Sequence, residues 1–174
     1  NKERTTGSRP ESNSAHVPLD YKGLYDGAIP SSTSLVVENL ELLFRLSGEL
    51  EYKNAVLRTL SAHKDEISAA PTACSVIIGS VYRMLSGNSR EIVVVGEGEE
   101  TEAMLELLQT GYFPNTVVHH KTSSNAEALA DAAAFTASLR TTSTTDASAY
   151  VCSGFTCERP VSTARELHAL ISDN

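Results

Sequence analysis

The spacing of apolar residues changes near residue 89, and a chain with this change has to join a helical part to an α/β part. Before the change, leucines and valines recur at three- and four-residue steps, the period of an amphipathic helix. After it, Ile92 to Val95 form an uninterrupted β-branched run, typical of a strand covered on both faces. We therefore expect an α+β fold, with a helical segment at 25–89 and a small α/β segment at 90–174.

Three helices account for the first segment. One begins at Ser31 or Ser32, either of which can cap it, and ends at Gly48. Two more are expected over 49–64 and 71–85. The apolar residues of the first helix occupy more than one narrow stripe: Leu35, Val36, Val37, Leu40, Leu42, Leu43, Phe44 and Leu46. A small α/β segment cannot cover so much apolar surface, so we expect other polypeptide to cover it.

Strands and helices alternate in the second segment. The strands are expected at 92–95, 116–120 and 149–152, and the helices at 99–110, 125–139 and 162–172. The polar stretch 141–148 is expected to be a loop. Strands separated by helices usually run parallel, so we expect a short parallel sheet.

Charge and hydropathy argue against two classes of function. Lys and Arg number 14 and Asp and Glu 22, which gives a formal net charge of −8 without a basic cluster. An acidic chain of this kind binds a phosphate backbone poorly, so no nucleic-acid partner is expected. No apolar run approaches the roughly 20 residues of a membrane-spanning helix.

The N-terminal stretch and the cysteine content bear on where the protein resides. Residues 1–24 are rich in Ser, Thr, Asn, Pro and charged residues, which is typical of a flexible linker. They lack the apolar stretch of a signal peptide, and because the chain begins at Asn1 we expect a processed or excised piece. Three unevenly spread cysteines argue against a disulfide-stapled secreted scaffold. We expect an intracellular protein, in the cytoplasm or an organelle such as the mitochondrion.

A glycine-rich turn follows the first strand, where a phosphate-binding loop would lie. The dinucleotide pattern needs a third glycine where this chain has Thr101, and Glu97 brings negative charge to the place of the phosphate. Acidic residues here suit the positive end of a helix dipole instead. No cofactor is expected.

Cys152 and Cys157 are the candidates for redox chemistry. Four residues separate them, which matches neither the paired cysteines of thioredoxin-type sites nor common zinc pairs. His119 and His120 are adjacent on one expected strand and point to opposite faces, so at most one could join a metal site. We expect reduced thiols and no metal, while a reversible disulfide across a tight loop stays an alternative; Cys74 is expected in the core.

The loop from Asp26 to Ser31 combines an acid, a glycine and a proline just before a helix. Such a combination is typical of turn and cap chemistry, in which the carboxylate accepts backbone N–H groups. Asp26 is a weak candidate for catalysis, because no nucleophile–base–acid set or carboxylate pair is recognisable by spacing.

Three stretches occur here in one order: 26–31, 91–96 and 149–157. In that order they resemble the C-terminal part of the spermatogenesis-associated protein 20 family, which are thioredoxin-domain-containing proteins, over residues 20–174. The resemblance implies an N-terminal thioredoxin-like domain, then an (α/α)6 barrel similar to N-acylglucosamine 2-epimerases and six-hairpin glycosidases, then a small α/β end. This chain would hold the last barrel helices and that end. Asp26 and Ser34 match the family, whereas Thr33 replaces an asparagine.

We therefore expect a structural or interaction part, without its own catalysis, of a larger thioredoxin-domain protein or multi-subunit assembly. Its partner would be the rest of the parent polypeptide or another subunit that covers the helices. Two alternatives stay open. One is part of a sugar isomerase- or epimerase-like barrel enzyme whose pocket Asp26 lines, and the other is a redox module that uses Cys152 and Cys157.

Overall fold

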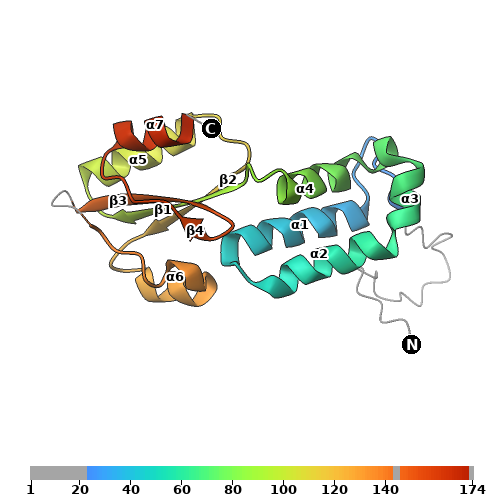
Figure 1. Ribbon diagram of the computed structural model, residues 1–174, viewed down its shortest axis with the longest axis horizontal. Coiled ribbons are helices and arrows are strands. Elements are labelled where there is room, and N and C mark those ends of the chain that lie inside the picture. The colour runs from blue at the N-terminus through green and yellow to red at the C-terminus, as the bar shows by residue number, and fades with distance from the viewer. Residues whose placement is uncertain (1–22, 143–145, 173–174) are drawn as a thin grey trace. The chain divides into compact units, whose positions relative to one another are not determined.

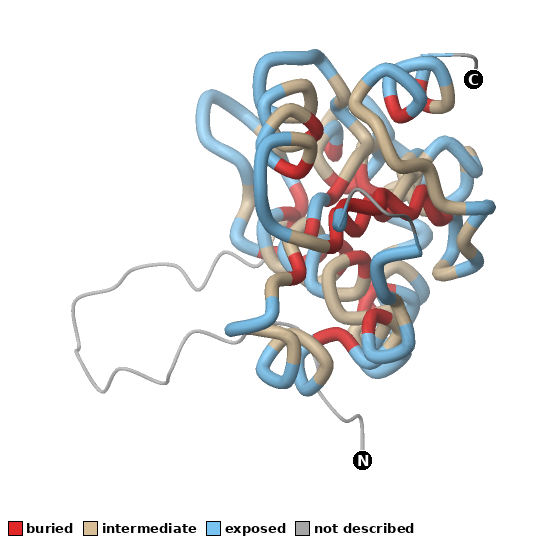
Figure 2. Tube along the Cα trace, turned by 90° about the vertical axis from the view of Figure 1, so that its left-hand side faces the viewer, coloured by how far each residue is buried: buried red, intermediate tan, exposed pale blue. Residues whose placement is uncertain are grey.

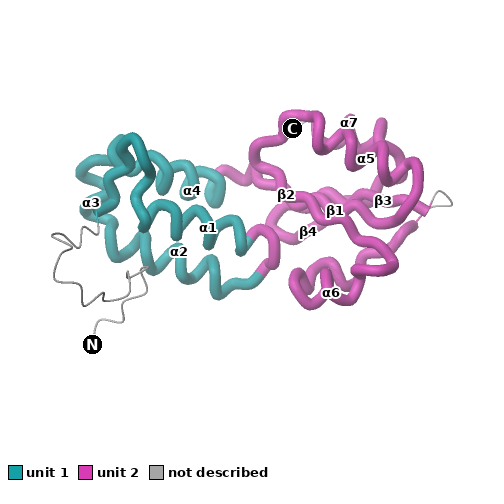
Figure 3. The backbone as a smooth tube through the Cα atoms, turned by 180° about the vertical axis from the view of Figure 1, so that it is seen from behind, with its two compact units in different colours: residues 1–44, 49–85 teal, residues 45–48, 86–174 magenta. Residues whose placement is uncertain are grey.

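A computed structural model describes residues 23–142 and 146–172. These residues divide into two compact units, the first within 1–44 and 49–85 and the second within 45–48 and 86–174 (Figure 3). All but the last two residues of the expected linker 1–24 lie outside the described part. The domain boundary near residue 89 stays a prediction.

The first unit is helical. Its elements are α1 (Ser32–Ser47), α2 (Leu50–Ala62), α3 (Lys64–Ala69), the 3₁₀ turn η1 (Pro71–Cys74) and α4 (Ser75–Leu85). The predicted helix 49–64 ends at Ala62 and is followed by the short α3, and the predicted helix 71–85 opens with a 3₁₀ turn. Ser31 caps α1 as expected, since its Oγ accepts the N–H of Ser34 at 3.0 Å.

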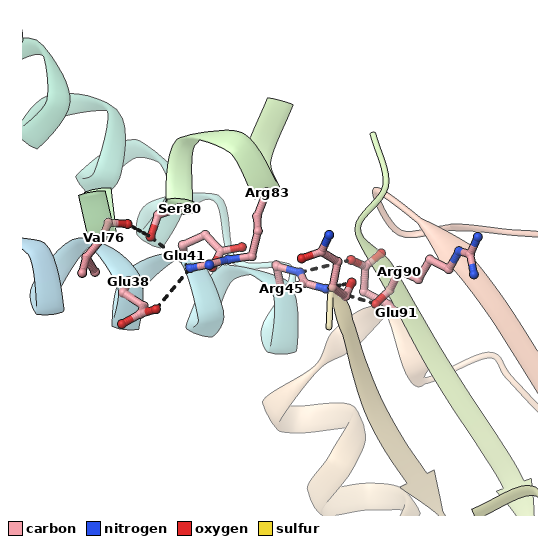
Figure 4. A network of polar contacts seen from close by, with 9 residues as sticks. Glu38, Glu41, Arg45, Val76, Ser80, Arg83, Arg90 and Glu91 are labelled. Atoms are coloured by element: carbon pink, nitrogen blue, oxygen red, sulfur yellow. Dashed lines mark hydrogen bonds and ion pairs between the residues drawn. The ribbon is translucent and has the colours of Figure 1, made fainter. Parts of the chain in front are cut away.

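A small apolar core and one ion-pair cluster hold these helices together. Five buried apolar residues form the core: Leu24, Val37, Val56, Cys74 and Ile77. Arg83 of α4 reaches α1, where its Nε lies 3.1 Å from Glu41 and its Nη2 3.4 Å from Glu38 (Figure 4). Glu41 is only 2% exposed, so this pairing compensates a buried charge.

The second unit is built on a four-stranded sheet with the order β2-β1-β3-β4. Its strands are β1 (Arg90–Gly96), β2 (Thr116–Lys121), β3 (Ala147–Ser153) and β4 (Thr156–Cys157). β1 and β2 are parallel, but β3 is antiparallel to both β1 and β4, so the prediction of a parallel sheet is wrong for two of the three strand pairings. The reason is that β2 ends at Lys121, opposite Val95, and β3 begins at Ala147, opposite Gly96, so both lie beside the C-terminal end of β1. A strand that begins at the end of the sheet where the previous strand finished must run antiparallel to that strand.

Helices cover both faces of this sheet (Figure 1). α5 (Glu99–Thr110) and α7 (Ala164–Ser172) lie on one face, while α6 (Ala126–Ala132) and the 3₁₀ turn η2 (Ala134–Thr136) lie on the other. The buried positions, red in Figure 2, include an apolar core beneath α5 and α7 made of Ile92, Val94, Met104, Ala147, Ala149, Val151, Leu167 and Ile171. The fold is therefore mixed α+β, as expected.

The predicted helix 125–139 is correct only up to Ala132. The buried ammonium of Lys121 requires acceptors, and it donates to the carbonyl oxygens of Thr136 at 2.6 Å and Leu139 at 3.0 Å. The backbone leaves the helical region at Ala133, with φ −145° and ψ 79°, and the chain turns so that these carbonyl oxygens reach the ammonium. Among the described residues, no helix has the length and apolar character required to cross a membrane.

Candidate functional site

Asp26 fastens the loop before α1 to the start of α4. Its Oδ1 accepts the N–H of Ser31 and its Oδ2 accepts the N–H of Val76, both at 2.9 Å. Burial raises the pKa of Asp26, but these hydrogen bonds, with those from the hydroxyls of Ser34 and Ser31, outweigh burial and leave the pKa lowered. The expectation that this carboxylate accepts backbone N–H groups is confirmed.

Cys152 of β3 and Cys157 of β4 are joined by a disulfide. They face each other across a hairpin whose two-residue loop is Gly154 and Phe155, with φ of 55° and 65°. Positive φ at both loop positions is the signature of a type I′ turn, which places residues five apart directly opposite each other. The expectation of two reduced thiols is therefore wrong, and the alternative of a disulfide across a tight loop holds.

Glu91 lies directly opposite Cys152 in the register of β1 and β3 and is 2% exposed. Its Oε2 accepts the N–H of Phe155 in the hairpin loop at 3.3 Å. Its Oε1 lies 3.9 Å from Nε of Arg45, which Figure 4 shows pointing toward it. Burial raises the pKa of Glu91 more than Phe155, Arg45 and Gly154 lower it. A buried carboxylate thus holds the loop that the disulfide closes.

Arg45 connects this carboxylate to the backbone of the sheet. The residue lies in the last turn of α1, within the stretch 45–48 that belongs to the second unit, and it is 6% exposed. Its Nη2 donates to the carbonyl oxygens of Asn115 and Arg90, where β2 and β1 begin. Disulfide, hairpin loop, Glu91 and Arg45 therefore form one connected chain of contacts.

Two further buried residues with basic side chains, His119 and Lys121, lie on β2. His119 is 9% exposed, its ring centroid is 5.6 Å from that of Phe135, and its Nε2 has no hydrogen-bond partner within the described ranges. Burial lowers its pKa, and a backbone contact with Leu46 raises it by less. Lys121 is 3% exposed, and burial also lowers its pKa.

The glycine-rich turn after β1 is hydrogen-bonded to another segment of the same chain. Oε1 of Glu97 accepts the N–H and the hydroxyl of Ser123, at 3.2 and 3.1 Å. A Cβ on Gly96 would lie 2.0 Å from the carbonyl oxygen of Asp146, so the glycine is required by close backbone approach. In the described part of the chain, no three His, Cys, Asp or Glu side chains gather as a metal centre would require.

Comparison with known proteins matches the chain to three curated relatives. The human spermatogenesis-associated protein 20 is 27% identical over 162 residues, which cover 90% of this chain and 20% of that protein. The mouse and rat proteins of the same name are 26% identical, and 20% of each is covered. The chain is a relative of spermatogenesis-associated protein 20. No protein-family model and no solved structure matches it.

The resemblance read from the sequence is thus confirmed, and its three stretches fall in both units. The loop 26–31 lies in the helical unit, 91–96 forms most of β1, and 149–157 spans the end of β3, the hairpin loop and β4. The chain spans about one fifth of the length of the curated proteins it matches, given coverage of 20%.

Sequence reasoning missed the buried polar residues of the sheet. Glu91, His119 and Lys121 share the face that η2 covers, together with Val93. The signal was present in the alternation of Val117, His119 and Lys121 along β2, which places all three side chains on one face. Arg45 gave no signal, because its partners lie 45 to 70 residues further along the chain.

Proposed function

We propose that this chain is a structural part, corresponding to the C-terminal region, of a larger thioredoxin-domain-containing protein. In this proposal, the helical unit supplies the last helices of an (α/α)6 barrel, and the preceding part of the same polypeptide covers it. The protein would be intracellular, in the cytoplasm or an organelle such as the mitochondrion. Catalysis would belong to other parts of the parent protein.

One observation carries the proposal, which is that each major helix of the first unit leaves large apolar side chains in solvent. On α2, Leu50 is 64% and Leu57 48% exposed, and on α4, Tyr82 is 58% and Leu85 79% exposed. Leu50 and Leu57 are seven residues apart and so lie on one side of their helix. Further exposed apolar residues of the unit are Leu35, Leu42 and Ile78.

The small interior of the unit explains why these side chains stay outside. Its core holds five buried apolar residues, contributed by the loop before α1, α1, α2, η1 and α4. Transfer of one large apolar side chain out of water is worth about 1.5–3 kcal/mol, so a neighbouring polypeptide that covers such stripes gains substantially. The relatives supply a source of that polypeptide, because the match covers only 20% of their length.

Self-association of the isolated 174-residue chain tests this proposal. We expect it to associate and to bind an apolar dye, and we expect Leu57→Lys with Leu85→Lys to reduce both. Tyr112→Lys is the matched control, since Tyr112 is 87% exposed in the second unit and should change neither. A monomeric chain that binds no dye would contradict the proposal.

A further inference from the structure

We propose that the Cys152–Cys157 disulfide is a redox switch: a dithiol reductant opens it by attack on Cys157, and its state determines whether the hairpin loop caps Glu91. This proposal goes beyond the structural function above. All of its residues lie in the second unit, between the last turn of α1 and β4.

Exposure decides which sulfur is attacked. Cys152 is 1% exposed on β3, whereas Cys157 is partly exposed on the two-residue strand β4. β4 is the outermost strand of the order β2-β1-β3-β4, so within the described ranges no strand covers its far side. A thiolate from solvent therefore meets Sγ of Cys157 first. A disulfide that is accessible to a thiolate exchanges more readily than a buried one.

The exchange proceeds in two balanced steps. A thiolate of the dithiol attacks Sγ of Cys157, the Cys152–Cys157 bond breaks, and its electron pair leaves on Cys152, which takes up a proton. The second thiol of the reductant then attacks the reductant's own sulfur in the mixed disulfide, and Cys157 leaves as a thiolate and is protonated. The reductant loses two electrons and becomes a disulfide, while the cysteine pair gains them.

Besides the disulfide, the hairpin loop is held by Glu91 and by the Phe155 ring, whose centroid lies 5.1 Å from that of Phe135. β4 pairs with β3 at only two positions, Cys152 with Cys157 and Ser153 with Thr156. Phe155 has a φ of 65°, a backbone conformation that bulky residues rarely adopt, and its N–H is held by Glu91. Once the covalent link opens, we expect Phe155 to relax toward negative φ and to withdraw its N–H from that carboxylate.

The structural change on reduction should extend to Arg45 but not to the residues that follow Cys157. The carboxylate that loses the Phe155 donor is the one that pairs with Arg45 at 3.9 Å. On the other side, the N–H of Glu158 donates to Val151 at 2.9 Å, and Val161 and Ala149 exchange two backbone hydrogen bonds. These bonds anchor the chain after the hairpin. The redox state should therefore change residues 153–156, Glu91 and the turn 45–48, and leave 158–172 as they are.

Hydrogen exchange on the full chain, oxidised and then reduced with dithiothreitol, tests the switch. Alkylation and mass analysis count the thiols at each stage. On reduction, we expect two thiols to be gained, protection to be lost in 153–156 and in 45–48, and protection in 158–172 to be unchanged. Reoxidation should restore the first pattern. Cys74→Ser, a buried cysteine outside the pair, should behave as the unaltered chain does.

Two variants separate the switch from simple unfolding. Cys152→Ser with Cys157→Ser should give the reduced pattern without any reductant. Glu91→Gln should still open and close its disulfide, but the response of 45–48 to reduction should be lost. Free thiols at both positions before reduction would overturn the proposal. An exchange pattern that is the same in both redox states, or one that changes throughout the chain, would also overturn it.

Discussion

Asp26 shows how one side chain can hold the N-terminal ends of two helices together. Its two oxygens accept N–H groups from the start of α1 and the start of α4, which lie 45 residues apart in sequence as Ser31 and Val76. This carboxylate is fully engaged with the fold, which supports a structural rather than a catalytic role for Asp26.

Replacement of Asp26 by Asn should destabilise the helical unit by roughly 0.5–2 kcal/mol, the range for loss of a capping hydrogen bond, because the amide can accept only one of the two N–H groups. Because the pKa of Asp26 is lowered from 3.8, its stabilisation is present above pH 3.8 and is lost as the pH falls through the lower folded pKa. Denaturant unfolding at several pH values should show this loss in the unaltered chain and not in Asp26→Asn. Glu106→Gln, at an exposed site on α5, is the control.

A variant as stable as the unaltered chain would show that the loop does not depend on this carboxylate. The reading of Asp26 as part of an enzyme pocket would gain if the parent protein converted a sugar and Asp26→Asn abolished that activity without lowering the melting temperature.

His119 should make the second unit sensitive to mild acid. Burial lowers the pKa of His119 from 6.5, so the neutral ring is the form that the fold accepts. The sign follows from linkage: the stabilisation is present above pH 6.5 and is lost as the pH falls through the lower folded pKa. Thermal unfolding should show that His119→Gln removes part of this acid sensitivity. His168→Gln, at an exposed position of α7, should leave it unchanged, and equal behaviour of the two variants would contradict the account.

At the scale of elements, local sequence patterns predicted the helices and strands that depend on neighbouring residues only. The helix expected at 99–110 is found there, because acidic residues fill its first turn and Gly111 ends it. The β-branched run gave the centre of β1. The direction of β3 and the existence of β4 could not be predicted, since they depend on where the chain re-enters the sheet and on Phe155 adopting positive φ. For the same reason, the spacing of Cys152 and Cys157 favours reduced thiols and leaves the disulfide as an alternative.

The turn η2 should depend on Lys121. The ammonium donates to three carbonyl oxygens of the stretch after α6: those of Thr136, Ala137 and Leu139. Lys121→Met would remove one donor from each carbonyl, although Leu139 still donates to Thr136, and Nη1 of Arg140 to Ala137 and Leu139. Hydrogen bonds to a charged group contribute about 1.5–3 kcal/mol. Chemical denaturation should therefore show a loss of this order, with Arg165→Met on the surface of α7 as the control. Unchanged or greater stability of Lys121→Met would show that other groups satisfy the turn.

At the scale of the whole molecule, the two units differ in how completely they cover their apolar surfaces. The sheet of the second unit is packed on both faces, by α5 and α7 on one side and by η2 on the other. In the first unit, α1, α2 and α4 each expose large apolar residues. This contrast supports the proposal that other polypeptide covers the first unit.

Hydroxyl-radical footprinting of the parent protein tests this claim most directly. The side chains of Tyr82 and Leu85, 58% and 79% exposed in the chain by itself, should be oxidised readily when the chain is isolated and protected when it is part of the parent. Tyr112, 87% exposed, should react in both. Equal oxidation of Tyr82 and Leu85 in the isolated chain and in the parent would contradict the account.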